Sequence, residues 1–422
     1  MRLTCAHIPV QERLAGRAVL SAAGLATRRF EARLVSGCRR TIVLKGQDLA
    51  FRLSTLLWFA LPLCGCESRQ PAGSGALSTG PATSTTEGTP PSRTWSPGVT
   101  GTFIDRASHD DLRLVSYNIL WNSIFPEVSV AGAVKFARVV QALNPDVLAL
   151  QEIGLHPEDR GKPNARRWTD RDVVALMNSL LPPPEGATWH ACQGGDNVIV
   201  SKYPLKLVAT DTNPPGERQQ AIALVDLPNE RFAFDLYVLN NHYKCCGNEA
   251  NDPQRQQQSD AIVGWLRDAR TPGGQIDLPP GTAIAIVGDL NIVGTFKPVE
   301  TLLTGDISDE NRYGPDFPPD WDGTGLVDAR PLHNIDGPDQ WTWRDDNDRW
   351  PPGRLDFIIY SDSVLSVAKQ FVLNTTTMRP EELKAAGLER FDVTIDDVGR
   401  QYDHLPLVID FRPAGLPSDK TE

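Results

Sequence analysis

The 422-residue sequence predicts an α/β sandwich, and three observations support this fold class. From about Leu112 onward, short apolar runs of strand length alternate with segments whose apolar residues recur at helical spacing. Turns rich in Gly and Pro separate these segments, and the sequence has no internal repeat of short period. Strands that pair into two layers, with helices outside them, bury the apolar faces of both kinds of element.

The composition allows a sizeable core but divides the charge unevenly along the chain. Hydrophobic residues make up 40% of the sequence, and the formal net charge is −11. Residues 1–66 contain ten Lys or Arg and three Asp or Glu, a net of +7; this leaves 32 basic and 50 acidic residues, a net of −18, in residues 67–422. Such an acidic body argues against tight, sequence-independent polyanion binding, although it is compatible with a locally basic cleft.

Residues 1–66 have the pattern of a signal or targeting segment. The apolar run 53–63 has the length of a signal-peptide core and is too short to span a bilayer comfortably. It ends in Leu63-Cys64-Gly65-Cys66, which resembles a bacterial lipobox with Cys64 in place of the usual small residue. We therefore expect an exported lipoprotein anchored to a membrane at Cys66. The alternatives are an ordinary signal peptide cleaved nearby, which gives a secreted protein, and a short membrane anchor. The long stretch before the apolar run favours a true start codon near Val43 or Leu44.

A flexible linker is expected at residues 67–105, before a folded domain at residues 106–415. From Ser68 to about Gly101 the chain is rich in Ser, Thr, Gly and Pro and has almost no bulky apolar residues. A segment of this composition cannot bury a core and behaves as a tether.

Within the folded domain, the pattern assigns the elements in chain order. The expected strands span residues 112–115, 147–150, 189–192, 197–201, 221–225, 232–240, 283–287, 355–360, 364–372 and 405–411. The expected helices span residues 131–143, 170–181 and 254–267. The first helix places Val134, Ala137, Val140 and Leu143 on one stripe. Long loops are expected at residues 154–168, 306–325 and 375–401, and loops of this length often carry specificity.

Polar side chains collect where expected strands begin or end. Four such segments are Ser116-Tyr117-Asn118, Gln151-Glu152, Gly288-Asp289-Leu290-Asn291 and Tyr402-Asp403-His404. The first three follow strands and the fourth precedes one. Open α/β sheets build their sites at strand ends, and acid, amide and imidazole groups together suit divalent metal binding and attack on a phosphate.

Each of these residues by itself also has an ordinary structural explanation. Glu152 would serve as a helix cap, the Asp289 to Asn291 segment as a turn, and His404 or His242 as polar surface. Asp356, inside an apolar strand, changes the balance, because breaking a buried ion pair costs about 3–5 kcal/mol and such a carboxylate needs a partner. An imidazole is a natural partner, since the carboxylate orients it and raises its basicity.

Taken together, seven segments resemble the endonuclease/exonuclease/phosphatase superfamily, the deoxyribonuclease I-like enzymes, from about Leu112 to Phe411. In order, they are Ser116-Tyr117-Asn118-Ile119, Leu150-Gln151-Glu152, Asn197-Val198-Ile199-Val200-Ser201-Lys202-Tyr203-Pro204, Asn240-Asn241-His242, Val287-Gly288-Asp289-Leu290-Asn291, Arg354-Leu355-Asp356-Phe357-Ile358 and Tyr402-Asp403-His404-Leu405-Pro406. The resemblance implies a four-layer α/β sandwich with two packed, mainly antiparallel β-sheets and a site at one edge of them.

The same resemblance implies a role for each site residue. Glu152 is similar to the main Mg²⁺ ligand of the family (with Mn²⁺ as the alternative ion), Asn118 lies beside it, and Asp403 is a further carboxylate of the metal site. Asp289 and Asn291 are similar to the groups that position the attacking water and the phosphate. His404 corresponds to the general base oriented by Asp356, and His242 to a donor to a phosphate oxygen.

These roles predict a Mg²⁺-dependent phosphoesterase, foremost a monomeric phosphodiesterase or nuclease acting on nucleic acid, and the signal-like segment predicts that it is exported. The alternative is a phosphatase or phospholipase-type hydrolase acting on an inositol phosphate, a phospholipid or another small phosphoester. A second alternative is an inactive surface-binding domain. Four basic residues near the motifs are candidates for local positive charge, namely Lys202, Lys244, Arg255 and Arg354.

The folded domain contains three cysteines, Cys192, Cys245 and Cys246. In an exported protein a disulfide is expected, either from Cys192 to one of the adjacent pair or within that pair. The spacing offers no second ligand pair for a zinc site.

Overall fold

The computed structural model describes residues 99–210, 218–247, 249–346, 349–393 and 402–415, and the backbone of three strands nearer the N-terminus. These strands, β1 (Gly16–Leu20), β2 (Ala26–Arg33) and β3 (Arg39–Val43), form an antiparallel sheet in a compact unit of residues 1–87. Residues 88–422 form the second unit. The predicted apolar run 53–63 and Cys66 lie outside the described residues.

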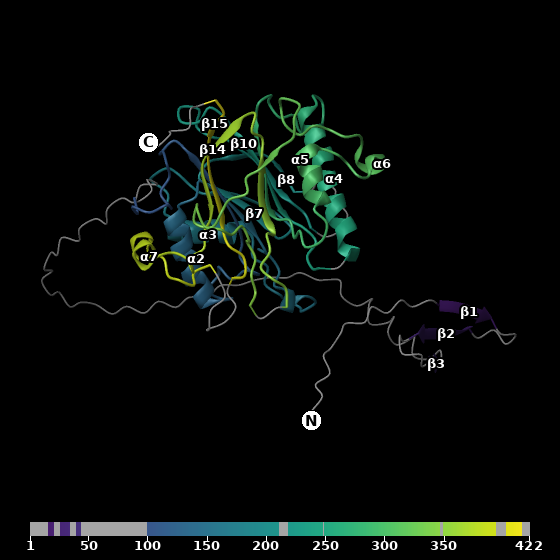
Figure 1. The fold of residues 1–422 in the computed structure, drawn as a ribbon. Helices are drawn as coiled ribbons and strands as arrows, with labels where there is room; N and C mark the ends of the chain where they lie inside the picture. The colour runs from purple at the N-terminus through teal and green to yellow at the C-terminus, as the bar shows by residue number, and fades with distance from the viewer. Residues whose placement is uncertain are drawn as a thin grey trace, which may run out of the picture. The chain divides into compact units, whose positions relative to one another are not determined.

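Two mixed β-sheets face each other in the larger unit (Figure 1). The first has the order β14 (Leu365–Val372), β15 (Leu407–Pro413), β4 (Leu112–Asn118), β5 (Val147–Gln151), β7 (Asn197–Ser201), β6 (His190–Gly194). The second has the order β12 (Val327–Asp328), β13 (Asp356–Tyr360), β11 (Ala283–Asp289), β10 (Leu236–His242), β9 (Ala221–Val225), β8 (Leu205–Ala209). Each sheet has one parallel pair, β4 with β5 and β10 with β11, and its other pairs are antiparallel. The predicted mainly antiparallel two-sheet sandwich is confirmed.

Helices cover the outer faces of the sheets and complete four layers (Figure 1). The first sheet is covered by α2 (Val130–Leu143) and α3 (Asp170–Leu180), and the second by α4 (Asp252–Arg270) and α5 (Lys297–Thr304). The shorter helices are α6 (Glu310–Tyr313), α7 (Pro380–Ala386) and the 3₁₀ turns η1 (Pro157–Asp159) and η2 (Glu249–Asn251). No helix in the described stretches has both the length and the apolar character needed to cross a membrane.

Two helices lie where the sequence predicted loops. The predicted loop 306–325 contains α6, and the predicted loop 375–401 contains α7. Because α6 is a single turn, it shows no helical period in the sequence. By contrast, α7 carries readable signals, with Pro380 in its first turn and Gly387 at its C-terminus in the left-handed conformation, φ 68°.

The buried face of α2 differs from the predicted stripe. Its buried apolar residues are Phe136, Val139, Val140 and Leu143. Val134 was predicted to be buried with Val140, but it is 49% exposed. The large Phe136 ring sets the orientation instead, because it stacks on Tyr117 of β4 with ring centroids 6.5 Å apart.

Packing in the larger unit begins before residue 106, where the linker was expected to end. Ile104 is 1% exposed, and Phe103 contacts Phe371 edge-on with ring centroids 5.1 Å apart. These two apolar side chains distinguish the end of the predicted linker from the Ser- and Pro-rich residues before it.

Strand register brings the C-terminal ends of both parallel pairs to an edge of their sheets. In the first sheet, Asn118 of β4 pairs with Gln151 of β5. In the second sheet, His242 of β10 pairs with Asp289 of β11, and the antiparallel strand β13 places Asp356 opposite Asp289.

Hydrogen bonds between buried amides join the two sheets beneath this edge. The Gln151 Nε2 donates to Asn240 Oδ1 at 2.7 Å. The Asn240 Nδ2 donates in turn to the carbonyl oxygens of Leu150 at 2.9 Å and Val198 at 3.1 Å. Because both amides are fully buried, a shift of one sheet against the other would break these hydrogen bonds in a place without water to replace them.

A buried ion pair fastens β15 to β4 and gives a test of the fold. Arg113 Nε and Nη2 lie 2.6 and 2.7 Å from the two Asp410 carboxylate oxygens, with both side chains almost fully buried. We expect Asp410→Ala to lower the free energy of unfolding by about 3–5 kcal/mol, because it leaves the guanidinium buried and unpaired. Asp346→Ala, which removes an exposed pair with Arg344, should cost less than about 1 kcal/mol. Equal midpoints of the two variants in urea unfolding would contradict this role.

Candidate active site

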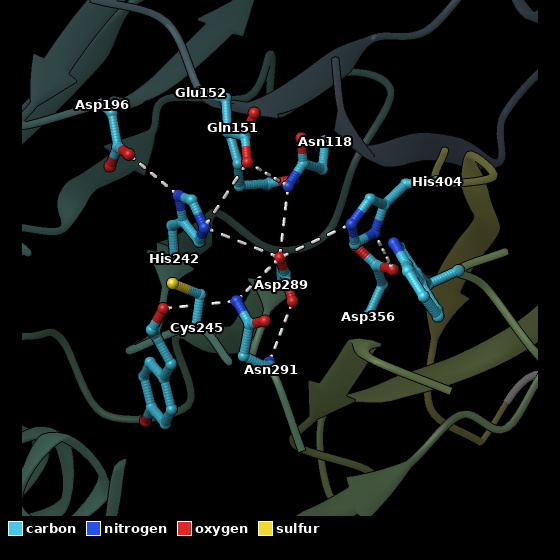
Figure 2. A network of polar contacts seen from close by, with 12 residues as sticks. Asn118, Gln151, Glu152, Asp196, His242, Cys245, Asp289, Asn291, Asp356 and His404 are labelled. Carbon is cyan, nitrogen blue, oxygen red and sulfur yellow. Dashed lines mark hydrogen bonds and ion pairs between the residues drawn. The ribbon is translucent and has the colours of Figure 1, made fainter. Parts of the chain in front are cut away.

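Polar side chains from both sheets converge at this edge (Figure 2). The first sheet supplies Asn118 at the end of β4, Glu152 directly after β5 and His404 shortly before β15. The second sheet supplies His242, Asp289 and Asn291 at the ends of β10 and β11, and Asp356 at the start of β13. All seven are buried, Glu152 being the most exposed at 8%. The structure thus gathers these predicted site residues in one place.

Asp289 lies at the centre of the cluster. Its Oδ2 accepts hydrogen bonds from Asn118 Nδ2 at 3.2 Å and from Asn291 Nδ2 at 2.9 Å. The same oxygen lies 3.6 Å from His242 Nε2 and 3.8 Å from His404 Nε2. One carboxylate therefore contacts groups from both sheets, and the two imidazoles approach it from opposite sides (Figure 2).

His404 is paired with Asp356, as predicted from the need of a buried carboxylate for a partner. The His404 Nδ1 lies 2.8 Å from Asp356 Oδ2. Thr342 Oγ1 donates to the same carboxylate oxygen at 2.6 Å, which holds it against the imidazole. The pair leaves Nε2 of His404 directed toward Asp289. This is the arrangement of an oriented base.

His242 has a partner that sequence reasoning missed. Its Nδ1 lies 2.9 Å from Oδ2 of Asp196, and its Nε2 lies 3.8 Å from Oε1 of Glu152. Asp196 sits in the turn between β6 and β7, directly before the Asn197 motif. The Gly194-Gly195-Asp196 turn was the available signal, but an Asp in a turn is too common to stand out.

The Glu152 carboxylate is held by groups around the mouth of the site. Its Oε1 accepts a hydrogen bond from Asn118 Nδ2 at 3.2 Å, and its Oε2 accepts one from the Trp121 backbone N–H at 2.8 Å. Asn118 accepts in turn from the Leu120 N–H at 3.1 Å. In this arrangement Asn118 presents its amide nitrogen, not its oxygen, to the carboxylates.

Backbone strain is concentrated at the site. Glu152 and Asn291 have φ values of 70° and 50°, and residues 120–122 are also left-handed. Such conformations cost about 1–3 kcal/mol each for residues other than glycine and persist where the surroundings enforce them. Only glycine fits at position 288, directly before Asp289, because a Cβ there would lie 2.0 Å from the Asn241 carbonyl oxygen.

The site concentrates negative charge in a buried place. Burial raises the pKa of Glu152 to about 7, and burial also raises the pKa of Asp289. Burial opposes protonation of His404, but the Asp356 and Asp289 carboxylates outweigh it and raise the His404 pKa to about 10. For His242, the Asp196 carboxylate likewise outweighs burial and raises the pKa. Carboxylates this close together favour a bound cation or protonated imidazoles.

The donor set fits a divalent metal. The predicted ligands Glu152 and Asp403 line the same pocket, and carboxylate oxygens are the ligands that Mg²⁺ prefers. A second grouping also has metal spacing, since ligand atoms of Asp289, Asp356 and His404 all lie within 4.8 Å of one another. Two members of that group already bond to each other, so an oriented base explains their spacing equally well.

The pocket above these groups has a volume of about 480 Å³ and is walled by aromatic side chains. Trp121, Trp343 and Trp350 line it, and Trp343 Nε1 donates to Asp403 Oδ2 at 3.2 Å. The polar cluster forms its floor, so a ligand here would meet charged groups below and indole rings at the sides.

The model of the endonuclease/exonuclease/phosphatase family matches residues 115–377, more than half of the chain. The chain belongs to this family. Its members hydrolyse phosphoesters, and the resemblance inferred from the seven segments is confirmed. No curated protein matches the sequence.

Several solved structures are similar to this family member. A humanised D. rerio TDP2 is 14% identical, over 72% of this chain and 99% of that one, with a TM-score of 0.44. The human nocturnin catalytic domain with bound sulfate is 16% identical, over 73% and 96%, with a TM-score of 0.43. A family protein from Leptotrichia buccalis is 13% identical, over 71% and 99%, with a TM-score of 0.43.

The basic residues expected near the motifs of this family member are engaged elsewhere. Lys202 is buried beside Asn144 and Asp146, and Arg354 is paired with Asp328. Arg255 is fully buried, and it and Lys244 are absent from the lining of the pocket. Proximity in sequence to a motif did not place these cations in the lining of the pocket. Lys202 follows the end of β7 that pairs with the start of β5, which is the opposite end from Glu152.

The three cysteines of the folded domain are free thiols in the structure. Cys192 is buried in the core on β6, where burial raises its pKa to about 12. Cys245 and Cys246 line the pocket instead, with their sulfur atoms 2.9 Å apart. The structure therefore does not join Cys192 to either of them, and a bond within the adjacent pair stays a prediction.

The pairing of His404 with Asp356 predicts a specific effect on the pH profile. Asp356→Asn should lower kcat by about 10²- to 10⁴-fold, because the imidazole loses its orienting carboxylate. The carboxylate stabilises protonated His404 and the base must be neutral, so the acidic limb of kcat/KM should also move to lower pH in the variant. The measurement is a pH–rate profile of both proteins. A fall in kcat without movement of the limb would show that Asp356 has only a structural role.

Proposed function

We propose that this chain is a divalent-metal-dependent phosphodiesterase that hydrolyses P–O bonds of nucleic acid with a water activated by His404. The observation that supports it most directly is a buried pocket floor with two imidazoles, each backed by its own aspartate. A structural core has no need for two such pairs facing one central carboxylate, and perturbed buried groups of this kind cluster at active sites.

The proposed metal is Mg²⁺, with Mn²⁺ as the alternative, held by Glu152 and Asp403, with Asn118 beside them. When bound, the ion would act as a Lewis acid that withdraws charge from a phosphate oxygen. The Asn118 amide donates to Glu152 and Asp289 and so positions both carboxylates.

His404 would act as the general base. Its Nδ1 is held by Asp356, so that Nε2 would be free to take a proton from the water that attacks the phosphate in the pocket. Asp289 and Asn291 border the same point, where their oxygens can accept from that water and fix its direction of attack. The contact with Asp196 raises the pKa of His242 and so favours its protonated form, which would donate from Nε2 to a phosphate oxygen as charge develops there.

A phosphatase or phospholipase-type activity on a small phosphoester is the second candidate. The limited volume of the pocket, about 480 Å³, and its indole walls favour it, because such a pocket encloses a small ligand. An inactive surface-binding domain is disfavoured. Burying Glu152, Asp289 and Asp356 together lowers the stability of the fold, and a domain without catalytic activity has no reason to keep them.

A substrate panel tests this function. Protein with Mg²⁺ should cleave plasmid DNA, RNA or bis-p-nitrophenyl phosphate, and EDTA should abolish turnover. Sphingomyelin and inositol phosphates in the same panel represent the second candidate. Glu152→Gln should weaken Mg²⁺ binding by about 10-fold or more in calorimetry, because a ligand charge is lost, whereas Glu230→Gln at an exposed turn should not. Metal-independent turnover, or no turnover of any substrate by folded protein, would refute the proposal.

We further propose that the protein is exported and tethered to a membrane through a lipid on Cys66. The lipobox-like ending of the apolar run 53–63 supports this, as does the Ser- and Pro-rich segment that follows. In a bacterial host, the wild-type chain should incorporate labelled palmitate and sediment with membranes. Cys66→Ser should lose both properties and Cys64→Ser should keep them. Labelling that survives Cys66→Ser would exclude this anchor.

A further inference from the structure

A second cavity adjoins the active-site pocket. Its volume is about 690 Å³, and Trp121 lines both spaces. Asp196, which binds His242, also lines the second cavity. The Trp121 ring lies next to the His242 imidazole, with ring centroids 6.3 Å apart. The wall between the two cavities is therefore built from Trp121 and the His242–Asp196 pair.

The second cavity is basic, in contrast to the acidic chain around it. Three arginines line it, Arg160, Arg167 and Arg218, together with one carboxylate, Asp196. Asp196 is occupied by His242 at 2.9 Å and lies 3.4 Å from Arg218. Within the described residues, neither Arg160 nor Arg167 forms an ion pair, so both guanidinium groups keep their charge available to a ligand.

The loop that carries Arg160 and Arg167 is anchored at its base. Leu155 and Arg167 form an antiparallel bridge, and the Trp168 N–H donates to the Gly154 carbonyl at 3.2 Å. Trp168 is buried and stacks on Phe125 with ring centroids 5.6 Å apart. These contacts hold the predicted long loop 154–168 beside the active-site pocket, where Arg160 and Arg167 line the second cavity.

Arg167 is also fitted closely to the turn beneath it. A Cβ atom at Gly154 would lie 3.7 Å from Arg167 Nη1, so the guanidinium lies over this glycine. Gly195, on the turn that carries Asp196, lines the same cavity.

We propose that this cavity, the arginine subsite (Arg160, Arg167 and Arg218), binds a second phosphate of the substrate, next to the phosphate hydrolysed at His404. The proposal rests on the proposed function and narrows its substrate class to an oligonucleotide. Guanidinium groups bind phosphate through paired hydrogen bonds. Trp121 separates the two phosphate positions and offers a ring on which a base can stack, a feature that suits a nucleotide chain.

The subsite also accounts for nucleic-acid binding by an acidic protein. A broad basic face is not needed if Arg160 and Arg167, which form no ion pair in the described residues, contact a single neighbouring phosphate. The subsite therefore predicts a small contact area and a weak dependence of binding on salt, unlike a nuclease that holds a long duplex.

The experiment compares a substrate that has one phosphate, bis-p-nitrophenyl phosphate, with a short oligothymidylate. In the Arg160→Ala/Arg167→Ala variant, KM for oligothymidylate should rise about 10-fold or more, from the loss of charge-assisted hydrogen bonds. Its kcat/KM for bis-p-nitrophenyl phosphate should stay within about 2-fold of wild type, since that substrate does not reach the subsite. Binding of labelled oligothymidylate in EDTA should weaken in parallel, which gives a readout independent of turnover.

Arg166→Ala is the matched control. Arg166 belongs to the same loop, but its guanidinium lies over the Trp168 ring and contacts Glu127 outside the cavity. It should leave both substrates unaffected. Arg160→Ala alone should give a smaller rise in KM for oligothymidylate. Because Arg160 is exposed, this variant should fold normally and keeps the test valid if the double variant misfolds.

Two results would overturn the subsite. One is an unchanged KM for oligothymidylate in the double variant, and the other is an equal loss on both substrates. A wild-type protein that turns over neither substrate would instead refute the proposed function.

Discussion

The inter-sheet hydrogen bonds of the Gln151 and Asn240 side chains are the constraint on which the site depends. They cross from one sheet to the other in a fully buried place, where a missing partner costs about 1–3 kcal/mol. Each amide sits at or near the end of a parallel strand pair, so satisfying them aligns the C-terminal ends of both pairs. Once the sheets are aligned, Asn118 reaches Asp289 across the sandwich without any further adjustment.

That alignment has an electrostatic consequence. Carboxylates from two sheets meet in a space with little water, and burial raises the pKa values of Glu152 and Asp289. The same crowding raises the pKa of His404, because the carboxylates of Asp356 and Asp289 lie beside its imidazole and outweigh the effect of burial. A divalent cation would relieve the crowding and release His404 to act as a base. The left-handed backbone at Glu152 and Asn291 shows that the fold maintains this arrangement at a cost in local strain.

The net charge of the chain is negative, but the cavity beside the site is lined by positively charged side chains. A net charge of −11 argues against a broad nucleic-acid surface, yet three arginines line the cavity beside the active site. They come from the loop after β5 and from the segment before β9, and no motif marks either position. The basic residues that do lie beside motifs, Lys202 and Arg354 among them, neutralise buried or neighbouring carboxylates instead. Local charge at the site is thus a product of chain folding and not of composition.

The sequence alone determined the family, the two-sheet sandwich and most of the residues of the polar cluster. It could do so because strand ends meet at the same edge of a sheet. Polar residues at those ends, such as Asn118, Asp289 and His404, were therefore expected to lie close together. The partnership of Asp356 with His404 was also predictable, since a buried carboxylate requires a partner. Only the tertiary structure showed that Asp196 backs His242, that Val134 faces outward on α2, and that Arg160 and Arg167 approach the site. These depend on how turns and loops fold over the sheet edge, and turn residues carry no periodicity from which their direction can be read.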